Sequence, residues 1–576
     1  MQRTLSLHSI VASTFPLLRF GCYLLIAGVL AMPAAADDEA LNQLAQQLVS
    51  QSQSTTTTGV SKVAESQINT YTNGSQTEPA VAMNADSLYV VVWQSHYSDG
   101  HGSGIQAMYN DRGTFGSSFS TTFQVNYHER DNQLNPAVAM DAEGNFVAVW
   151  QNVDSDGSGY SIERRYFDID DTARWDASST SISTSATNHA YSQFNPAVAM
   201  NASGTYVIVW ESNGSDGTDT DGRSIQAQHY NADGTVNIGE FQVNTYTNGD
   251  QGEPAVAIDD DGSFVVVWHS GGSSGTDTDH RSIQAQRYNA DGTVNGGEFQ
   301  VNTETHGQQM HPSVAMDADG DFVVVWQSTD GNGADTDGAG IKGQRYDANG
   351  TAQGSEFLVN TYTASSQTAP SVAMDADGDF TVAWESRGSD GTDNQHASVQ
   401  AQRYEADGTA SDSQFQVNEA YTRSGQKQAA VAMSADGSHF VIAWRSWGST
   451  GTDNSRHSIQ HAQYEVGTIT ASKTTWAPNQ ASGAGEMPQH LTLEQNYPNP
   501  FNPSTSIRYG VPEAGTVRLA IYDMLGRKVA QLVNGAQEAG WHNVQWHASS
   551  DRVSGLYLYR IDMNGASQQG TMMLVK

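Results

Sequence analysis

The stretch PSVAMDADGDFVVVWQS, from Pro312 to Ser328, holds two short apolar runs on either side of an acidic segment. The runs SVAM and FVVVW have the length of strands, and FVVVW is rich in residues that favour them. The segment DADGD between them has the Asp and Gly that tight turns use. The stretch therefore predicts a β-hairpin.

This hairpin recurs along the chain. Copies of PAVAM begin at Pro79, Pro136, Pro196, Pro254, Pro312, Pro370 and, as AAVAM, at Ala429. A tryptophan follows each copy, at Trp93, Trp150, Trp210, Trp268, Trp326, Trp384 and Trp444, and neighbouring tryptophans are 57 to 60 positions apart. Self-similarity at a fixed period is the signature of a repeat architecture, so the chain contains seven copies of one unit.

Each unit predicts four strands. The first two form the hairpin, the third is a run such as SIQAQRY (Ser282–Tyr288), and the fourth is a run such as EFQVN (Glu298–Asn302). The second run is continuously apolar, as in a strand covered on both faces, whereas the third and fourth alternate as half-covered strands do. Four strands at this period predict an all-β fold, a seven-bladed β-propeller over residues 66–467. An open β-solenoid or a string of small sandwiches is the alternative.

The phase of the repeat predicts how the ring closes. SQINTY (Ser66–Tyr71) precedes the first copy and matches FQVNTY of later copies, while the last copy lacks a fourth strand of its own. We therefore expect the N-terminal strand to complete the last blade, which leaves no exposed sheet edge there.

The repeated tryptophans are interpreted as core residues, because each ends the most apolar strand of its unit. Stacking on a sugar ring is the alternative role. Trp447 lies outside the repeat, so we expect it in a loop and at the surface.

The acids of the opening stretch suggest calcium, but their spacing argues against it. An EF-hand loop needs acids at positions 1, 3 and 5, a glycine at 6 and an acid at 12. Counted from Asp317, Gly320 is at position 4 and Ser328 at position 12, so a turn is the better interpretation. The loops after the tryptophans are a second calcium hypothesis, although Gly/Ser/Asp loops also serve as plain solvated connections. Their metal candidates are Asp219, Asp221, Asp277, Asp279, Asp335 and Asp337.

No catalytic or cofactor-binding residue is predicted, and calcium is the one cofactor considered. Some residues depart from the repeat, but they form no catalytic triad, metal-ligand motif or carboxylate pair that the sequence reveals. These residues are His96, Tyr97, His101, His128, Glu129, Arg130, His306 and His311.

The N-terminal region predicts export. Residues 1–36 have basic residues, an apolar stretch and an Ala34-x-Ala36 cleavage site, as a signal peptide does. The chain's single cysteine, Cys22, lies within it. We expect residues 37–65 to be a short helix and a Ser/Thr-rich linker, and no later segment to be apolar enough to span a membrane. The formal charge of -36 makes nucleic acid an unfavourable partner.

A polar linker, 468–490, precedes a C-terminal domain at 491–576 whose runs TVRLAIYD, HNVQWHA and GLYLYRID predict a small antiparallel sandwich. The motifs NYPNPFNP, YDMLGRKV, SGLYLYRI and the terminal MMLVK follow one another in it. This domain closely resembles the type A C-terminal sorting domain of type IX secretion system cargo. The residues that carry the resemblance are Asn496, Pro498, Pro500, Phe501, Asn502, Pro503, Tyr522, Asp523, Gly526, Gly555, Tyr557 and Lys576.

The resemblance implies an Ig-like fold, the outer-membrane export machinery as partner, and a secreted or cell-surface location. The repeat region resembles repeats of bacterial surface proteins only loosely. Our leading interpretation is a propeller that binds a glycan or a protein without chemistry of its own. A secreted hydrolase acting on polysaccharide or another polymer, and a structural surface-layer component, are the alternatives.

Overall fold

The computed structural model describes residues 56–470 and 491–574, with breaks in several loops. The breaks are 111–121, 128–131, 154–158, 169–179, 183–191, 215–216, 273–274, 278–279, 330–337, 389–390, 392, 394–395, 423, 450, 454–455, 494–503, 524–526, 549–554 and 565. The chain divides into two compact units, Met1–Lys473 and Thr474–Lys576. The predicted signal peptide and the predicted short helix lie outside the described residues. Within those residues all regular structure is β, and no helix is long and apolar enough to cross a membrane.

Each repeat of the first unit forms one four-stranded antiparallel sheet, and the described residues contain seven such sheets. The first strands are β2(Gln76–Met83), β6(Gln133–Met140), β10(Gln193–Met200), β14(Gln251–Ile258), β18(Gln309–Met316), β22(Gln367–Met374) and β26(Gln426–Met433). The second strands are β3(Tyr89–His96), β7(Phe146–Val153), β11(Tyr206–Ser212), β15(Phe264–Ser270), β19(Phe322–Ser328), β23(Phe380–Arg387) and β27(His439–Trp447). The third strands are β4(Ser103–Tyr109), β8(Tyr160–Phe167), β12(Ser224–Tyr230), β16(Ser282–Tyr288), β20(Gly340–Tyr346), β24(Ala397–Tyr404) and β28(His457–Thr470). The fourth strands are β5(Phe123–Gln124), β9(Thr180–Ser181), β13(Val236–Gln242), β17(Phe299–Gln300), β21(Ala352–Leu358), β25(Phe415–Gln416) and, in the last sheet, β1(Thr56–Gln67).

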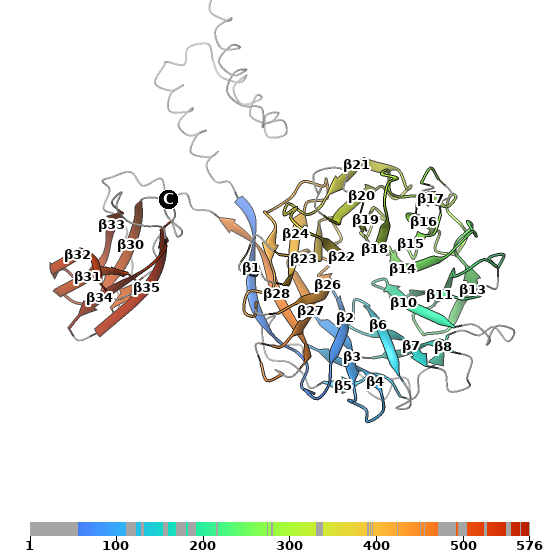
Figure 1. The fold of residues 1–576 in the computed structure, drawn as a ribbon, viewed down its shortest axis with the longest axis horizontal. Helices are drawn as coiled ribbons and strands as arrows, with labels where there is room; N and C mark the ends of the chain where they lie inside the picture. The colour runs from blue at the N-terminus through green and yellow to red at the C-terminus, as the bar shows by residue number, and fades with distance from the viewer. Residues whose placement is uncertain are drawn as a thin grey trace, which may run out of the picture. The chain divides into compact units, whose positions relative to one another are not determined.

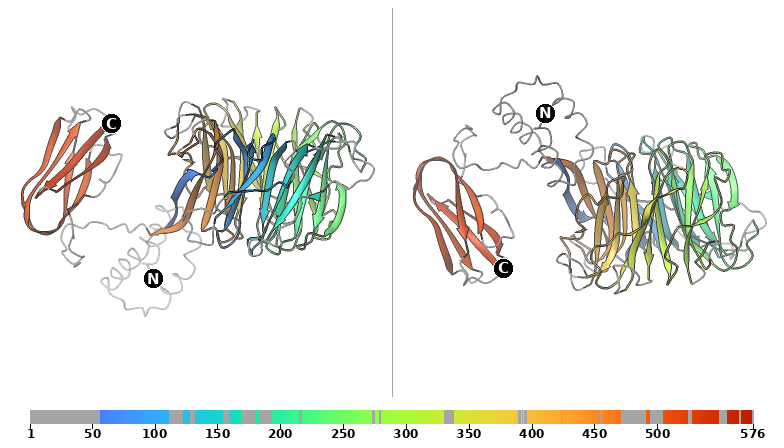
Figure 2. Two further views of the ribbon diagram at one scale, coloured as in Figure 1. Left: turned by 90° about the horizontal axis from the view of Figure 1, so that it is seen from below. Right: turned by 90° about the horizontal axis from the view of Figure 1, so that it is seen from above.

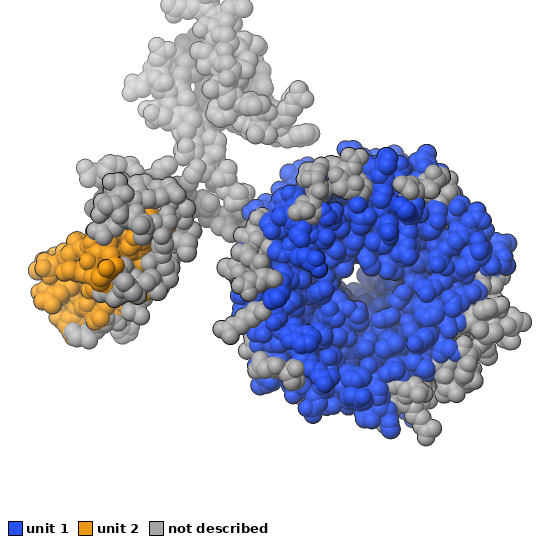
Figure 3. All heavy atoms as spheres, in the orientation of Figure 1, with its two compact units in different colours: residues 1–473 blue, residues 474–576 orange. Residues whose placement is uncertain are grey.

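The sheets stand around a central opening, with the first strand of each sheet innermost (Figures 1 and 3). Their strands run between the two faces of the unit (Figure 2). The core consists of apolar clusters between neighbouring sheets. One cluster joins Trp326 of β19 to Val267 of β15, and another joins Trp93 of β3 to Val441 of β27, from the first and last sheets. The seven repeated tryptophans are at most 1% exposed, which confirms them as core residues.

The N-terminal strand β1 pairs antiparallel with β28, the third strand of the last repeat, as the phase of the repeat predicts. It begins at Thr56, so residues 56–65 belong to this sheet and not to the linker that the sequence suggests there. Glu65 of β1 accepts hydrogen bonds from the backbone amides of Glu419 (3.1 Å) and Ala420 (3.0 Å). Elsewhere a fourth-strand residue does the same for the preceding loop, as Glu356 does for Thr303 (2.8 Å).

The third strand differs from its prediction. All seven side chains of β16 are buried, although the alternation of SIQAQRY suggests a half-covered strand. The polar side chains are buried because they are hydrogen-bonded. Gln284 donates to the Ser282 hydroxyl (2.8 Å), and Gln286 donates to the Arg287 carbonyl (3.0 Å).

In the described part of the second unit, seven strands form two antiparallel sheets, ordered β29-β30-β33 and β32-β31-β34-β35. Apolar residues of both sheets, such as Ile507 and Leu519, form one core between them. This is a two-layer arrangement, as the alternating strands predict. The strands are β29(Thr492–Leu493), β30(Ser504–Val511), β31(Gly515–Asp523), β32(Lys528–Gln537), β33(Gly540–His547), β34(Gly555–Met563) and β35(Ala566–Leu574).

Candidate functional site

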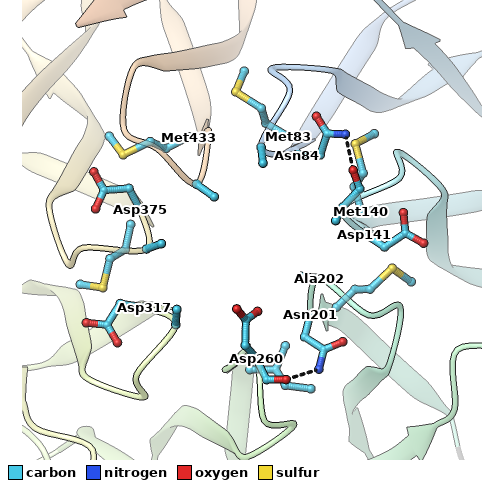
Figure 4. Close-up of a pocket in the computed structure, with 18 of the residues that line it drawn as sticks. Met83, Asn84, Met140, Asp141, Asn201, Ala202, Asp260, Asp317, Asp375 and Met433 are labelled. Carbon is cyan, nitrogen blue, oxygen red and sulfur yellow. Dashed lines mark hydrogen bonds between the residues drawn. The ribbon is translucent and has the colours of Figure 1, made fainter.

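The hairpin turns between first and second strands surround one end of the central opening, which we call the turn end (Figure 4). In the stretch that predicted the fold, the Asp317 carboxylate accepts hydrogen bonds from the amides of Asp319 (3.0 Å) and Asp321 (2.9 Å). Gly320 adopts a φ of 90°, which favours glycine. The acidic segment is thus a turn, and its first carboxylate is used within it.

Three aspartates that close turns at this end have raised pKa values. Burial raises the pKa of the Asp141 and Asp317 carboxyls, and it raises that of Asp375 to about 6. Among the described residues, no group of three His, Cys, Asp or Glu side chains is placed to hold a metal ion. The residue after the one that closes each turn is alanine in six copies. In the fourth copy it is Asp260, whose exposed carboxylate points into the opening (Figure 4).

The other end of the opening, which we call the mouth, is lined in each copy by two residues. They are the residue just before the PAVAM sequence and the first residue of that sequence. All seven preceding residues have a left-handed backbone, with φ between 46° and 56°. Each lies where the register between first and second strand shifts, a bulge that turns its side chain out of the ladder. These mouth residues are Glu78, Asn135, Asn195, Glu253, His311, Ala369 and Gln428. Six are polar, yet they differ from copy to copy.

A charged cluster stands among them. One Glu253 oxygen lies 2.9 Å from Nδ1 of His311 and 3.2 Å from Nδ1 of His269, and it accepts the His311 backbone amide at 3.1 Å. Burial opposes ionisation of Glu253, but the hydrogen bonds from the two histidines outweigh it and hold its pKa well below the ordinary range. The same hydrogen bond raises the pKa of His311. The cluster is therefore an ion pair when His311 is protonated.

A buried carboxylate fixes Glu253 from behind. Glu211, which follows Trp210, accepts the Glu253 amide (2.7 Å) and the Asn195 side-chain amide (2.7 Å), and its other oxygen pairs with Arg223 (2.8 Å). Gln327, which follows Trp326, accepts the amide of the mouth residue Ala369 (3.4 Å) in the same way. In the sixth copy Glu385 accepts the Gln428 amide (2.7 Å), and burial raises its pKa.

In the loops predicted to bind calcium, the buried aspartates form hydrogen bonds within the protein. Asp219 and Asp277 are 3% and 1% exposed, and each accepts a hydrogen bond at 2.7 Å from an asparagine amide, Asn244 or Asn302. The backbone amides of Asp219 and Asp277 donate to the side-chain oxygen of a fourth-strand glutamine, Gln242 or Gln300. Asp221 is exposed, while Asp279, Asp335 and Asp337 lie outside the described residues. Calcium binding in these loops stays a prediction.

The other off-pattern residues are scattered. The His96 ring contacts the exposed ring of Tyr97 at 4.0 Å between centroids. His101 is exposed, and so is His306, which pairs with Glu304 at 2.8 Å. His128, Glu129 and Arg130 lie outside the described residues. Trp447 is 53% exposed as expected, although it ends strand β27 and does not lie in a loop.

The sequence pointed to His311 but missed its partners Glu253 and His269, and it missed Glu385 and Asp260. An alignment of the seven copies on their tryptophans contains the signal, because the residue types at these positions vary between copies, whereas the flanking strand residues repeat. In that alignment His269 and Glu385 follow the tryptophan, where three copies have glutamine.

Of the sorting residues, Tyr522 and Asp523 end β31, Gly555 begins β34 and Tyr557 is buried in the core of the second unit. Asn496, Pro498, Pro500, Phe501, Asn502, Pro503, Gly526 and Lys576 lie outside the described residues. Residues 495–575 match the family model of the secretion system C-terminal sorting domain. This match confirms the predicted sorting domain. The chain is therefore exported through the outer membrane to the cell surface or the extracellular space.

Comparisons with solved structures are more distant. A protein of unknown function from Dyadobacter fermentans has a TM-score of 0.42 and 10% identity, covering 71% of this chain and 99% of its own. An α-L-arabinanase of Penicillium chrysogenum, complexed with arabinobiose, has a TM-score of 0.39 and 15% identity. The match covers 57% of this chain and 92% of the arabinanase chain. The polysaccharide lyase Uly1 has a TM-score of 0.42 and 10% identity, and the match covers 69% of this chain and 91% of the lyase chain. All three scores are below 0.5, so they carry no functional argument. No curated protein matches the sequence.

Proposed function

We propose that the first unit is a closed seven-bladed propeller which binds a glycan at its mouth, and which the sorting domain delivers to the outside of the cell. Seven equivalent backbone positions with unlike, mostly polar side chains around one opening are the observation that carries this proposal. Amide, carboxylate and imidazole groups match the hydroxyls of a sugar in hydrogen-bonding capacity. A few placed polar groups in a concave site are what small-ligand recognition uses.

The backbone supports a binding role because the mouth side chains are held at a cost. Residues other than glycine in the left-handed region lose about 1–2 kcal/mol each. A purely structural bulge would be cheaper with glycine, which none of the seven positions has. The bulge instead presents a chosen side chain to the opening.

The test is a glycan-binding screen with the full chain, with and without calcium, followed by titration calorimetry on the best ligand. Glu253→Gln and His311→Asn place residues of other copies at these positions, so we expect both variants to fold. Each should weaken binding about tenfold or more, since hydrogen bonds to charged groups contribute about 1.5–3 kcal/mol. Asp260→Ala, which restores the repeat residue at the turn end, is the matched control. Equal affinity of the two mouth variants and wild type refutes the proposal.

A hydrolase acting on polysaccharide is the second candidate, and the opposed behaviour of two carboxyls favours it. Hydrogen bonds from two histidines lower the pKa of Glu253 and burial raises that of Glu385, and glycoside hydrolysis uses one ionised and one protonated carboxyl. A reducing-end assay on the glycans that bind separates the two functions. Turnover that Glu253→Gln and Glu385→Gln both abolish, with binding retained by Glu385→Gln, supports the hydrolase. Binding without turnover supports the binding protein.

A further inference from the structure

Two exposed aromatic side chains lie at the seam where the first and last sheets of the first unit meet. These sheets lie side by side and share an apolar cluster (Figure 1). Tyr97 follows strand β3 of the first sheet and is 55% exposed, and Trp447 ends strand β27 of the last sheet and is 53% exposed. Second strands run from the turn end to the mouth side of the unit, so both residues lie on the mouth side. Trp447 shares its side of β27 with Val441 and Ala443, which pack against the first sheet.

A series of contacts crosses the seam from one aromatic residue to the other. The Trp447 indole meets the His457 ring edge-on, at 4.6 Å between centroids, and Nδ1 of His457 lies 3.3 Å from the Ser75 hydroxyl. The Ser75 carbonyl accepts the His96 amide at 3.0 Å, and the His96 ring lies 4.0 Å from the Tyr97 ring. We call Trp447, His457, Ser75, His96 and Tyr97 the seam platform.

The backbone at Tyr97 is strained. Tyr97 has a φ of 64°, whereas Gly388 and Gly448 occupy the equivalent position in the sixth and seventh copies with φ of 94° and 88°. All three donate their amide to the residue that precedes the third strand, so the local structure is the same. Glycine adopts this conformation freely, but a bulky residue does not. Core packing does not account for so exposed a side chain, and retained strain of this kind is typical of functional sites.

Trp447 is equally specific to its copy. No other copy has a tryptophan three residues after the repeated one, and the fifth copy has Thr329 there. Burial, and then the charge of Arg445, lower the pKa of His457 to about 4, so the ring beside the indole is neutral at ordinary pH. The platform therefore offers aromatic faces and neutral hydrogen-bonding groups, with Arg445 as the cation that acts on it.

We propose that the seam platform binds a neutral polysaccharide, with sugar rings stacked on Trp447 and Tyr97. The proposal rests on the proposed glycan-binding function and adds its ligand class and a second contact area outside the mouth. Tryptophan and tyrosine combine an apolar ring with a polar edge, which matches the C–H face and the hydroxyls of a sugar. Sugars with equatorial hydroxyls, such as β-1,4-linked glucose and xylose, present such faces along an extended chain. The net charge of -36 disfavours an anionic polymer.

The repeat supplies variants that should fold. Trp447→Thr places the threonine of the fifth copy, and Tyr97→Gly places the glycine of the sixth and seventh copies. Tyr127→Thr is the matched control, because it removes a tyrosine that is 56% exposed from the loop that leads to the second sheet. Threonine occupies this position in other copies, as at Thr245.

Titration calorimetry of the full chain uses cellohexaose, xylohexaose and polygalacturonate as probes. We expect wild type to bind at least one of the neutral hexasaccharides, and polygalacturonate more weakly. Trp447→Thr should bind at least tenfold more weakly, Tyr97→Gly several-fold more weakly, and Tyr127→Thr like wild type. Urea unfolding of Tyr97→Gly should have a midpoint equal to or above that of wild type, because glycine relieves the strain. Weaker binding by a variant of undiminished stability separates a ligand contact from a structural role.

Equal affinity of Trp447→Thr and wild type overturns the platform, as does the absence of binding to both neutral hexasaccharides. Tighter binding of polygalacturonate overturns the neutral ligand class. Self-association that Trp447→Thr abolishes, without sugar binding, overturns the proposal in favour of a second copy of this chain as the partner. Glu253→Gln distinguishes the two proposals. If it has no effect while Trp447→Thr loses binding, the mouth fails and the platform stands; the reverse result fails the platform alone.

Discussion

The same seven strands make both ends of the central opening, yet the two ends differ in what they repeat. At the turn end the copies agree: a Met or Ile, a side chain that closes its own turn, and an alanine in all but one copy. At the mouth the backbone repeats closely while the side chains change from copy to copy. Agreement of side chains indicates a structural task, whereas agreement of backbone alone indicates a scaffold for different side chains.

The two ends also use different residue types where the backbone is left-handed. Turns use glycine, such as Gly320 with φ of 90°, which adopts this conformation without strain. The mouth uses Glu, Asn, His, Ala and Gln at φ near 50°. The turn end is therefore built for stability, and the mouth gives up stability for its side chains.

Gly320→Ala tests the turn end and has the largest expected effect. A Cβ there would adopt a left-handed φ and lie 3.1 Å from an Asp259 oxygen and 3.3 Å from the Ala348 Cβ. We expect the free energy of unfolding in urea, followed by tryptophan fluorescence, to fall by about 2 kcal/mol. Gly354→Ala, at a φ of 77° with open space around it, controls for strain alone and should cost about 1 kcal/mol. An unchanged Gly320→Ala variant would contradict the structural role of the turn.

Ala369→Gly tests the mouth and should act in the opposite direction. Ala369 has a φ of 50° and no polar side chain to lose. Relief of the left-handed strain outweighs the extra freedom of glycine in the unfolded chain, so we expect stability to rise by about 0.5–1 kcal/mol. The same urea titration measures it. A loss of more than 1 kcal/mol would show that the mouth backbone is not strained.

The fold was predictable because it is periodic: seven tryptophans at nearly constant spacing require one packing solution, used seven times. The mouth cluster was not, because Glu253 and His269 are 16 residues apart in sequence and meet through the pairing of β14 with β15, while His311 comes from the neighbouring sheet. The third strand was misread because buried glutamines such as Gln284 look like a solvated face until their partners are known. Likewise, the acids of the loops looked like ligands for calcium, but Asp219 is already bonded to Asn244.

The ion pair between Glu253 and His311 gives the mouth a pH dependence that the turn end should lack. The pKa of Glu253 is lowered, so its contribution to stability is present above the ordinary value of 4.5 and is lost as pH falls below it. The pKa of His311 is raised, so its contribution is complete below 6.5 and is lost as pH rises through the higher folded value. The stability difference between wild type and His311→Asn should therefore be largest between pH 4.5 and 6.5. Both side chains are partly exposed, so we expect a difference of only about 0.5 kcal/mol, measured by urea unfolding at several pH values. Ala369→Gly, which removes no titrating group from the mouth, should differ from wild type by a constant amount across this range, and a flat difference for His311→Asn as well would mean that the two side chains do not pair.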